Sequence, residues 1–168
     1  MPNYRRMYRE GHCYFLTVVT YMRNPILIEN IELLRESFRY SKTKFDYKIE
    51  AIVVLSDHIH MIIEPKVATQ YPEIIRTIKN YFSKNCPLEC YKHIEQSKSR
   101  EKEGYKPIWQ KRFYEHTIRD EEDFENTKVY IYNNPIKHGY VEKIEDWKYS
   151  SRRFGNTEHK KMGYKNIK

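Results

Sequence analysis

The sequence predicts an α+β fold, because segments with a strand pattern alternate along the chain with segments that have a helical pattern. β-Branched and aromatic residues dominate the strand segments, and apolar residues three and four positions apart mark the helices. Their order is strand, helix, strand, strand, helix, strand, followed by one more helix. This is the β-α-β-β-α-β arrangement of ferredoxin-like domains, and it predicts one sheet with the additional helix lying over it.

Each element has its own signal in the sequence. The strand pattern and the helical spacing fall in six segments: residues 13–20, 47–55, 58–64 and 108–118 for strands, and residues 31–44 and 72–84 for helices. Ser56 and Asp57 separate the second and third strands by a tight hairpin turn. Residues 86–106 are polar and charged, and we expect a solvated loop or a short extra helix there.

The additional helix begins after Asp120, which suits an N-cap position. The acidic residues that follow it favour the positive end of a helix dipole. Pro135 disfavours helical geometry at the residue before it, so we expect the helix to end near Asn134.

The length of 168 residues predicts a single domain. Within it, residues 1–12 form a basic arm, residues 13–135 form the core and residues 136–168 form a basic C-terminal extension. The three cysteines form no paired framework, which is typical of a reducing compartment such as the cytoplasm. No apolar segment is long enough to span a bilayer, so we expect no membrane partner.

Charge and aromatic content point to nucleic acid. The formal net charge is +8, the pI is about 9.2, and 16 of the residues are tyrosines. Basic side chains neutralise a phosphate backbone, and aromatic rings stack on unpaired bases. Ribosomal and other basic proteins share the charge, so the composition alone does not identify a function.

Two histidines lie two residues apart in the third predicted strand. Because side chains alternate on a strand, His58 and His60 point to the same face, about 7 Å apart, and Ile59 points to the other face. Two imidazoles on a rigid strand can hold a divalent metal. The alternative is a pair of polar residues on the wet face of an edge strand.

A second group of polar side chains lies on the additional helix. Tyr130 and Asn134 are four residues apart, so they share one helix face, one turn from each other. A phenol and an amide oxygen on that face could reach one metal-bound phosphate together. The alternative is a half-buried tyrosine near a helix end with an ordinary polar residue after it.

Four segments together resemble the REP-associated tyrosine transposases, which are single-tyrosine members of the HUH superfamily of single-strand DNA transposases and nickases. The resemblance covers residues from about 5 to 154. The segments that carry it are Arg5-Arg6 with residues 11–20, then Asp57-His58-Ile59-His60, then Trp109–His116, and then Tyr130–Gly139.

The resemblance implies an enzyme that cuts and rejoins single-stranded DNA beside a repeat hairpin. It implies that Tyr130 is the nucleophile of a 5′-phosphotyrosine intermediate, and that His58, His60 and Asn134 hold Mg²⁺ or Mn²⁺. Many transposase relatives have glutamine where this chain has Asn134, which is one methylene shorter. The enzyme would be a monomer, or a homodimer in which the partner completes each site.

Six basic residues are predicted to contact the DNA backbone: Arg5, Arg6 and Arg9 of the arm, and Lys111, Arg112 and Lys137. His138, next to Lys137, is equally compatible with a phosphate contact and with simple exposure. Two other functions stay open at this stage. One is a catalytically inactive module that binds single strands or hairpins, and the other is a small metal-dependent hydrolase that uses water in place of tyrosine.

Overall fold

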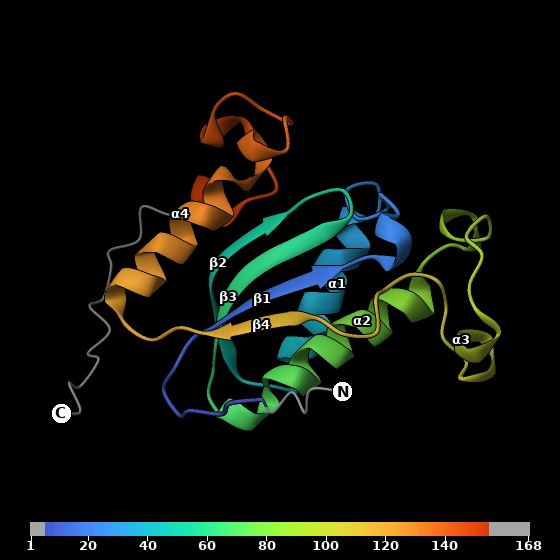
Figure 1. Ribbon diagram of the computed structural model, residues 1–168, viewed down its shortest axis with the longest axis horizontal. Coiled ribbons are helices and arrows are strands. Elements are labelled where there is room, and N and C mark those ends of the chain that lie inside the picture. Colours follow the sequence, from blue (N-terminus) through green and yellow to red (C-terminus); the bar gives the residue numbers. More distant parts are fainter. Residues whose placement is uncertain (1–5, 155–168) are drawn as a thin grey trace.

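The computed structural model describes residues 6–154, and these form a mixed α+β fold with one four-stranded antiparallel sheet (Figure 1). The elements, in chain order, are β1 (Tyr14–Val19), α1 (Ile31–Lys42), β2 (Tyr47–Val54), β3 (His58–Pro65), α2 (Tyr71–Asn85), α3 (Lys98–Lys102), β4 (Tyr114–Thr117) and α4 (Glu121–Lys137). Short 3-10 helices lie at Tyr21–Arg23, Ala68–Gln70, Leu88–Cys90, Ile144–Asp146 and Ser151–Phe154.

The strands lie in the order β2-β3-β1-β4, so β3 is a central strand and β4 is an edge strand. His58 pairs with Val19 and His60 pairs with Thr17 across the β1–β3 ladder. Tyr114 of β4 pairs with the other side of Thr17. The interpretation of the two histidines as residues of an edge strand is therefore wrong.

Helices α1 and α2 cover one face of the sheet, and α4 lies against the other (Figure 1). The larger core joins alternate residues of β1 and β3, such as Leu16 and Met61, to the apolar side of α2, such as Ile78. The smaller core joins Phe15 and Ile62 to α4. Because Ile59 and Met61 face α2, the alternation of side chains turns His58 and His60 toward the side of α4.

The fourth strand is much shorter than predicted. Residues 108–118 were expected to form it, but the ladder includes only Tyr114–Thr117, and Trp109 forms a single bridge with Thr20. The ammonium of Lys79 on α2 donates hydrogen bonds to the carbonyls of residues 110 and 111. Residues 108–110 still lie beside the end of β1, because the Gln110 N–H donates to the Val19 carbonyl at 3.0 Å. The pairing is therefore interrupted at residues 110–113, between the Trp109 bridge and the ladder that starts at Tyr114.

Helix α4 begins where the sequence predicts and ends later. The Asp120 carboxylate caps it by accepting a hydrogen bond of 2.8 Å from the Asp123 N–H. The predicted end near Asn134 is wrong, because the helix continues through Pro135 to Lys137. The N–H of His138 still donates to the Asn134 carbonyl, so a proline in the last turn does not end the helix.

Residues 86–106 are not simply a solvated insertion. Arg100 of α3 is buried, its guanidinium lies over the Tyr21 ring, and it donates a hydrogen bond of 3.0 Å to the Trp109 carbonyl. The segment is thus anchored beside the end of β1. Among the helices between residues 6 and 154, none combines the length and the apolar character needed to cross a bilayer.

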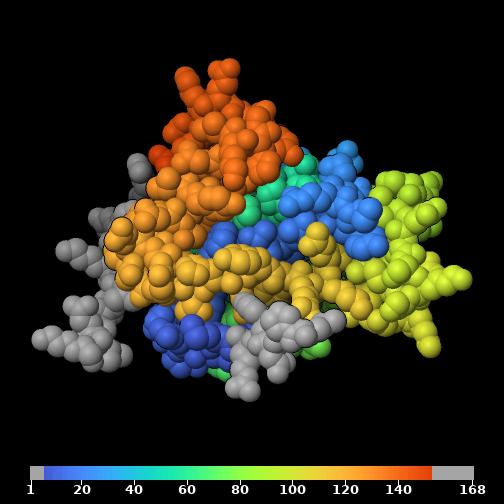
Figure 2. Space-filling view, viewed as in Figure 1, coloured from blue at the N-terminus to red at the C-terminus, as the bar shows by residue number. Residues whose placement is uncertain are grey.

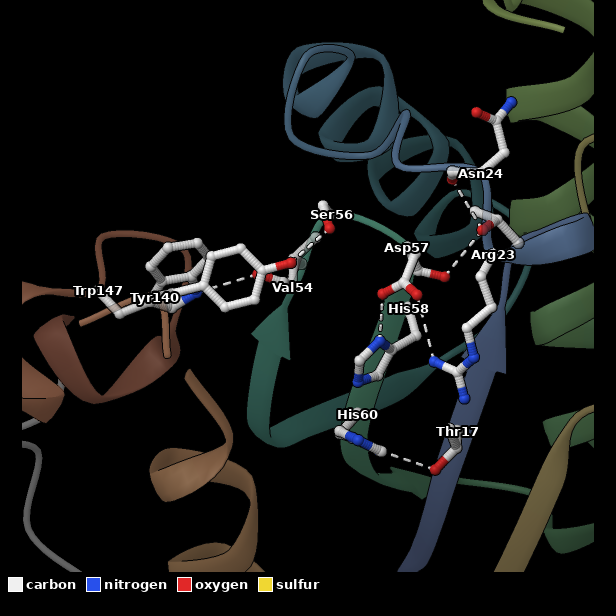
Figure 3. Close-up of polar contacts among 11 residues, drawn as sticks. Thr17, Arg23, Asn24, Val54, Ser56, Asp57, His58, His60, Tyr140 and Trp147 are labelled. Carbon is white, nitrogen blue, oxygen red and sulfur yellow. Dashed lines mark hydrogen bonds and ion pairs between the residues drawn. The ribbon is translucent and has the colours of Figure 1, made fainter. Parts of the chain in front are cut away.

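The chain after α4 returns to the β2–β3 hairpin. The Trp147 indole N–H donates to the Val54 carbonyl at 3.0 Å, and the Tyr140 hydroxyl is hydrogen-bonded to Ser56 at 2.5 Å (Figure 3). These contacts tie the C-terminal end of α4 to the hairpin that carries His58.

Candidate active site

A cleft of about 750 Å³ lies between one side of α4 and the sheet, beside the part of the helix that packs on it (Figure 2). Its floor comes from β1 and β3, and its walls come from α4, β4 and the loop after β1. The lining residues are Phe15, Thr17, Arg23, His58, His60, Tyr114, His116, Asn126, Thr127, Tyr130, Lys137 and His138. The cleft therefore brings together His58, His60, Tyr130 and Lys137, which the sequence had singled out in two distant segments.

Both strand histidines are held in place through the same ring atom (Figure 3). Nδ1 of His58 donates to the Asp57 carboxylate at 2.6 Å, and Nδ1 of His60 is hydrogen-bonded to the Thr17 hydroxyl at 2.8 Å. The two rings are buried, with centroids 4.8 Å apart. Because each Nδ1 is used, each Nε2 is the atom available to a ligand, as in metal sites where a carboxylate or hydroxyl orients the imidazole.

Arg23 is a site residue that the sequence did not reveal. Its guanidinium lies 3.2 Å from the second oxygen of Asp57, the carboxylate that holds His58 (Figure 3). Burial raises the pKa of Asp57, but the hydrogen bonds and charges of His58 and Arg23 outweigh it and leave that pKa lowered. Met22 and Arg23 both have positive φ angles, 53° and 54°, a conformation that is uncommon outside glycine and is often found at functional sites.

Tyr130 lies over the middle of the cleft. Its ring centroid is 5.3 Å from that of His60 and 5.9 Å from that of Phe15, and 41% of the residue is exposed. The ammonium of Lys137 lies 5.5 Å from the ring centroid, which places positive charge beside the phenol. A reacting group between Tyr130 and the histidines would thus meet a hydroxyl, two imidazoles and a cation.

Asn134 is buried one turn after Tyr130 and does not line the cleft. Neither its amide oxygen nor its amide nitrogen has a hydrogen-bond partner in the part of the chain that the structure describes. Between residues 6 and 154, no three side chains of the His, Cys, Asp and Glu types are grouped so that they could hold a metal ion. A metal ion on the two histidines would need an oxygen ligand of another kind, and the buried amide oxygen of Asn134 is chemically suited to that role.

His138 adds a third imidazole to the cleft, next to His58. Its ring centroid is 5.3 Å from that of His58. Burial lowers its pKa, and the nearby charge of His58 acts in the same direction. From the sequence, His138 was equally compatible with a phosphate contact and with exposure; in the structure it lines the cleft and is also exposed.

Burial lowers the pKa of His60 to about 3, and the positive charges of His58, His138, Lys137 and Arg23 act in the same direction. The ring is therefore neutral at pH 7, which is the form that binds a metal. The pKa of a histidine in an unfolded chain is near 6.5. As the pH falls, His60 is therefore protonated in the unfolded state before it is protonated in the folded state.

We expect His60 to make the metal-free protein less stable in acid. The contribution of His60 to the free energy of unfolding is fully present above pH 6.5 and is lost as the pH falls from 6.5 toward 3. Urea unfolding with chelator should give a free energy of unfolding roughly 2 kcal/mol lower at pH 4.5 than at pH 7 from this residue alone. His60→Gln should remove that part of the loss, whereas His93→Gln, at an exposed position outside the cleft, should not. Equal acid sensitivity in all three proteins would contradict this.

The six predicted DNA contacts differ in what they do in the structure. Arg6 is paired with Glu115 at 3.1 Å and lies over the Phe113 ring, and Lys111 is paired with Glu103 at 2.6 Å. Arg9 and Arg112 are exposed, Lys137 lines the cleft, and Arg5 lies outside the described residues. Of these residues, Lys137 is the one that the cleft brings next to Tyr130.

Comparisons with known proteins agree on one family. Residues 9–134 match the family model of IS200-like transposases. A Haemophilus influenzae protein described as a REP-associated tyrosine transposase is 39% identical over 90% of this chain and 85% of its own length. The REP-associated tyrosine transposase of Escherichia coli K12 is 34% identical over 90% of this chain and 82% of its own length.

A solved structure is similar as well. It is that of a REP-associated tyrosine transposase bound to a REP hairpin; it is 32% identical, with a TM-score of 0.74 over 92% of this chain and 84% of the other. The curated relatives and the solved structure thus cover at least 90% of the chain, and the family model covers residues 9–134. The chain belongs to the REP-associated tyrosine transposases, within the IS200-like transposase family.

Proposed function

We propose that this transposase cleaves and rejoins single-stranded DNA beside a repeat hairpin, with Tyr130 as the nucleophile. The observation that carries the proposal is the position of the Tyr130 ring, 5.3 Å from that of His60 in a cleft that also contains His58 and Lys137. A phenol is suited to forming a covalent ester by phosphoryl transfer.

In the proposed step, the Tyr130 oxygen attacks the phosphorus of a phosphodiester. A bond forms between that oxygen and phosphorus, and the bond from phosphorus to the 3′-oxygen breaks. The phenol loses its proton, the 3′-oxygen leaves as a hydroxyl, and the DNA 5′-phosphate stays on the tyrosine. The reverse attack by a DNA 3′-hydroxyl restores a phosphodiester, so cutting and joining use one site and no nucleotide triphosphate.

We propose that His58, His60 and Asn134 hold the divalent cation, Mg²⁺ or Mn²⁺. When bound, this ion supplies the charge that polarises a non-bridging phosphate oxygen. Asp57 and Thr17 orient the two imidazoles through their Nδ1 atoms. Lys137 and Arg23 bring positive charge to the place where the phosphate binds.

We also assign the sheet to the ferredoxin-like type. The strand order β2-β3-β1-β4, in which β3 lies between the parallel strands β1 and β2, supports this assignment. A cytoplasmic location is part of the same proposal, and the odd number of cysteines, three with no paired framework in the sequence, supports it.

The substrate test follows from the solved relative, which is bound to a REP hairpin. We expect a labelled hairpin with a single-stranded 5′ flank to be bound and nicked in that flank. The fully paired version should be bound weakly and left uncut, because unpaired bases add stacking and let the backbone enter the cleft. Affinity for both should fall as salt rises, because phosphate contacts release counterions. Equal cleavage of the paired duplex at the same salt would contradict this substrate.

The alternatives predict different products. A catalytically inactive module would bind the hairpin and leave it whole. A hydrolase that uses water would cut the strand without a covalent adduct. The proposed transposase gives both a cut strand and a protein–DNA adduct that persists after denaturation.

A further inference from the structure

One face of α4 lines both ends of the cleft, but the two ends differ in their side chains. Counted from Tyr130, Asn126 and Thr127 precede it by four and three residues, whereas Lys137 and His138 follow it by seven and eight. Residues at these spacings share a helix face. Tyr130 therefore lies between a charged end and a second end that the proposed chemistry does not use.

The second end lies between β4 and the first half of α4, and its lining contains no lysine or arginine. Its side chains within the described chain are those of Tyr114, His116, Asn126 and Thr127. The cations of the cleft lining, Arg23 and Lys137, lie near His60 instead, where both lower its pKa. A phosphate would be drawn to the charged end, so the aromatic end, whose lining has no lysine or arginine, suits an uncharged part of the substrate.

Tyr114 is placed to contact such a group. It shares a row of the sheet with His60, with Thr17 between them on β1, so the two backbones lie about 10 Å apart. It is on an edge strand, 60% exposed, and its ring meets Phe15 edge-on with centroids 6.1 Å apart. An exposed tyrosine braced on one side by a core aromatic residue is a good platform for a flat ring.

One polar residue at this end is held in place by an ion pair beside the cleft. His116 lies two residues after Tyr114 on the same sheet face, and its Nε2 is hydrogen-bonded to Asp123 at 2.8 Å. The Asp123 carboxylate also accepts from the Arg119 backbone N–H at 3.0 Å and from the Arg119 guanidinium at 3.2 Å, so this cation is already paired. Asn126 offers an amide and Thr127 a hydroxyl, and both can donate and accept hydrogen bonds.

We propose that this end of the cleft is a nucleobase subsite for an unpaired base next to the phosphate that Tyr130 attacks. The base stacks on Tyr114, and Asn126 and Thr127 bind its polar edge. The inference rests on the proposed function for the identity of the substrate. It predicts that binding depends on the base at one flanking position, which the charged end of the cleft does not predict.

Binding measurements test the subsite without requiring cleavage. In a Tyr130→Phe protein, a hairpin with a single-stranded flank is titrated, and the flank carries one abasic site at each position in turn. We expect one position where loss of the base weakens binding about tenfold. With Tyr114→Ala added, the intact and abasic strands should bind with equal affinity. Tyr114→Phe should restore the difference, because the ring is kept.

Tyr40→Ala is the matched control, since Tyr40 is an exposed tyrosine on α1, outside the cleft. It should leave the tenfold difference unchanged. Because the readout is a ratio between two strands on one protein, a general loss of folded protein cancels out. The proposal is overturned if no position shows the difference, or if Tyr114→Ala keeps it. Failure of the adduct to form in wild type would overturn the proposed function while leaving this binding result intact.

Discussion

Replacing Tyr130 with phenylalanine is expected to abolish cleavage and the covalent adduct, with strand cutting reduced at least about a thousandfold. The substitution removes only the hydroxyl that attacks phosphorus. Hairpin binding should change little, because the ring keeps its contacts with His60 and Phe15. The measurement is a denaturing gel of labelled hairpin DNA, read for both the cut strand and the protein-linked strand.

Tyr132→Phe is the matched control for this loss. Tyr132 is two residues along α4, packs with the smaller core, and has its hydroxyl 3.2 Å from that of Ser151. It lies on another face of the helix from Tyr130. Its variant should cut and form the adduct at nearly the wild-type rate. If Tyr132→Phe lost the adduct and Tyr130→Phe kept it, the nucleophile would be misassigned.

The second large effect concerns the metal. His58→Ala or His60→Ala should each reduce cleavage at least about a hundredfold, and chelator should do the same to wild type until Mg²⁺ or Mn²⁺ is added back. Asn134→Ala should reduce cleavage less completely and raise the metal concentration needed. Asp57→Asn should weaken metal affinity about 10–100-fold, because Asp57 orients His58.

His93→Ala, at an exposed position outside the cleft, controls for the loss of a histidine as such. It should keep full activity and the same metal requirement. Full cleavage by wild type in excess chelator, or by the His60→Ala protein at any metal concentration, would rule out the metal site.

The sequence was sufficient for features that depend on local alternation or spacing. The period of two along β3 turns His58 and His60 to one face, and the period of the helix sets Tyr130 apart from Tyr132. An α+β fold with an antiparallel sheet follows from the order of such patterns. These features could be predicted because each is fixed by residues close together in the chain.

Features that depend on contacts between distant segments were missed or wrong. Arg23 joins the site only because the loop after β1 lies beside the β2–β3 hairpin, where it meets Asp57. The pairing of the fourth strand is interrupted at residues 110–113, where Lys79 of α2 donates hydrogen bonds to the carbonyls of residues 110 and 111. Pro135 lies inside α4 and is buried in its last turn. No local pattern encodes these contacts.

The measurement that tests the central claim most directly is identification of the residue that becomes linked to DNA. Wild-type protein is reacted with hairpin DNA in Mg²⁺, the adduct is digested with nuclease and protease, and the peptides are analysed by mass spectrometry. The account predicts a 5′-phosphonucleotide on Tyr130 in the peptide that spans α4. A nucleotide on any other tyrosine, or a cut strand with no linked peptide, would contradict it.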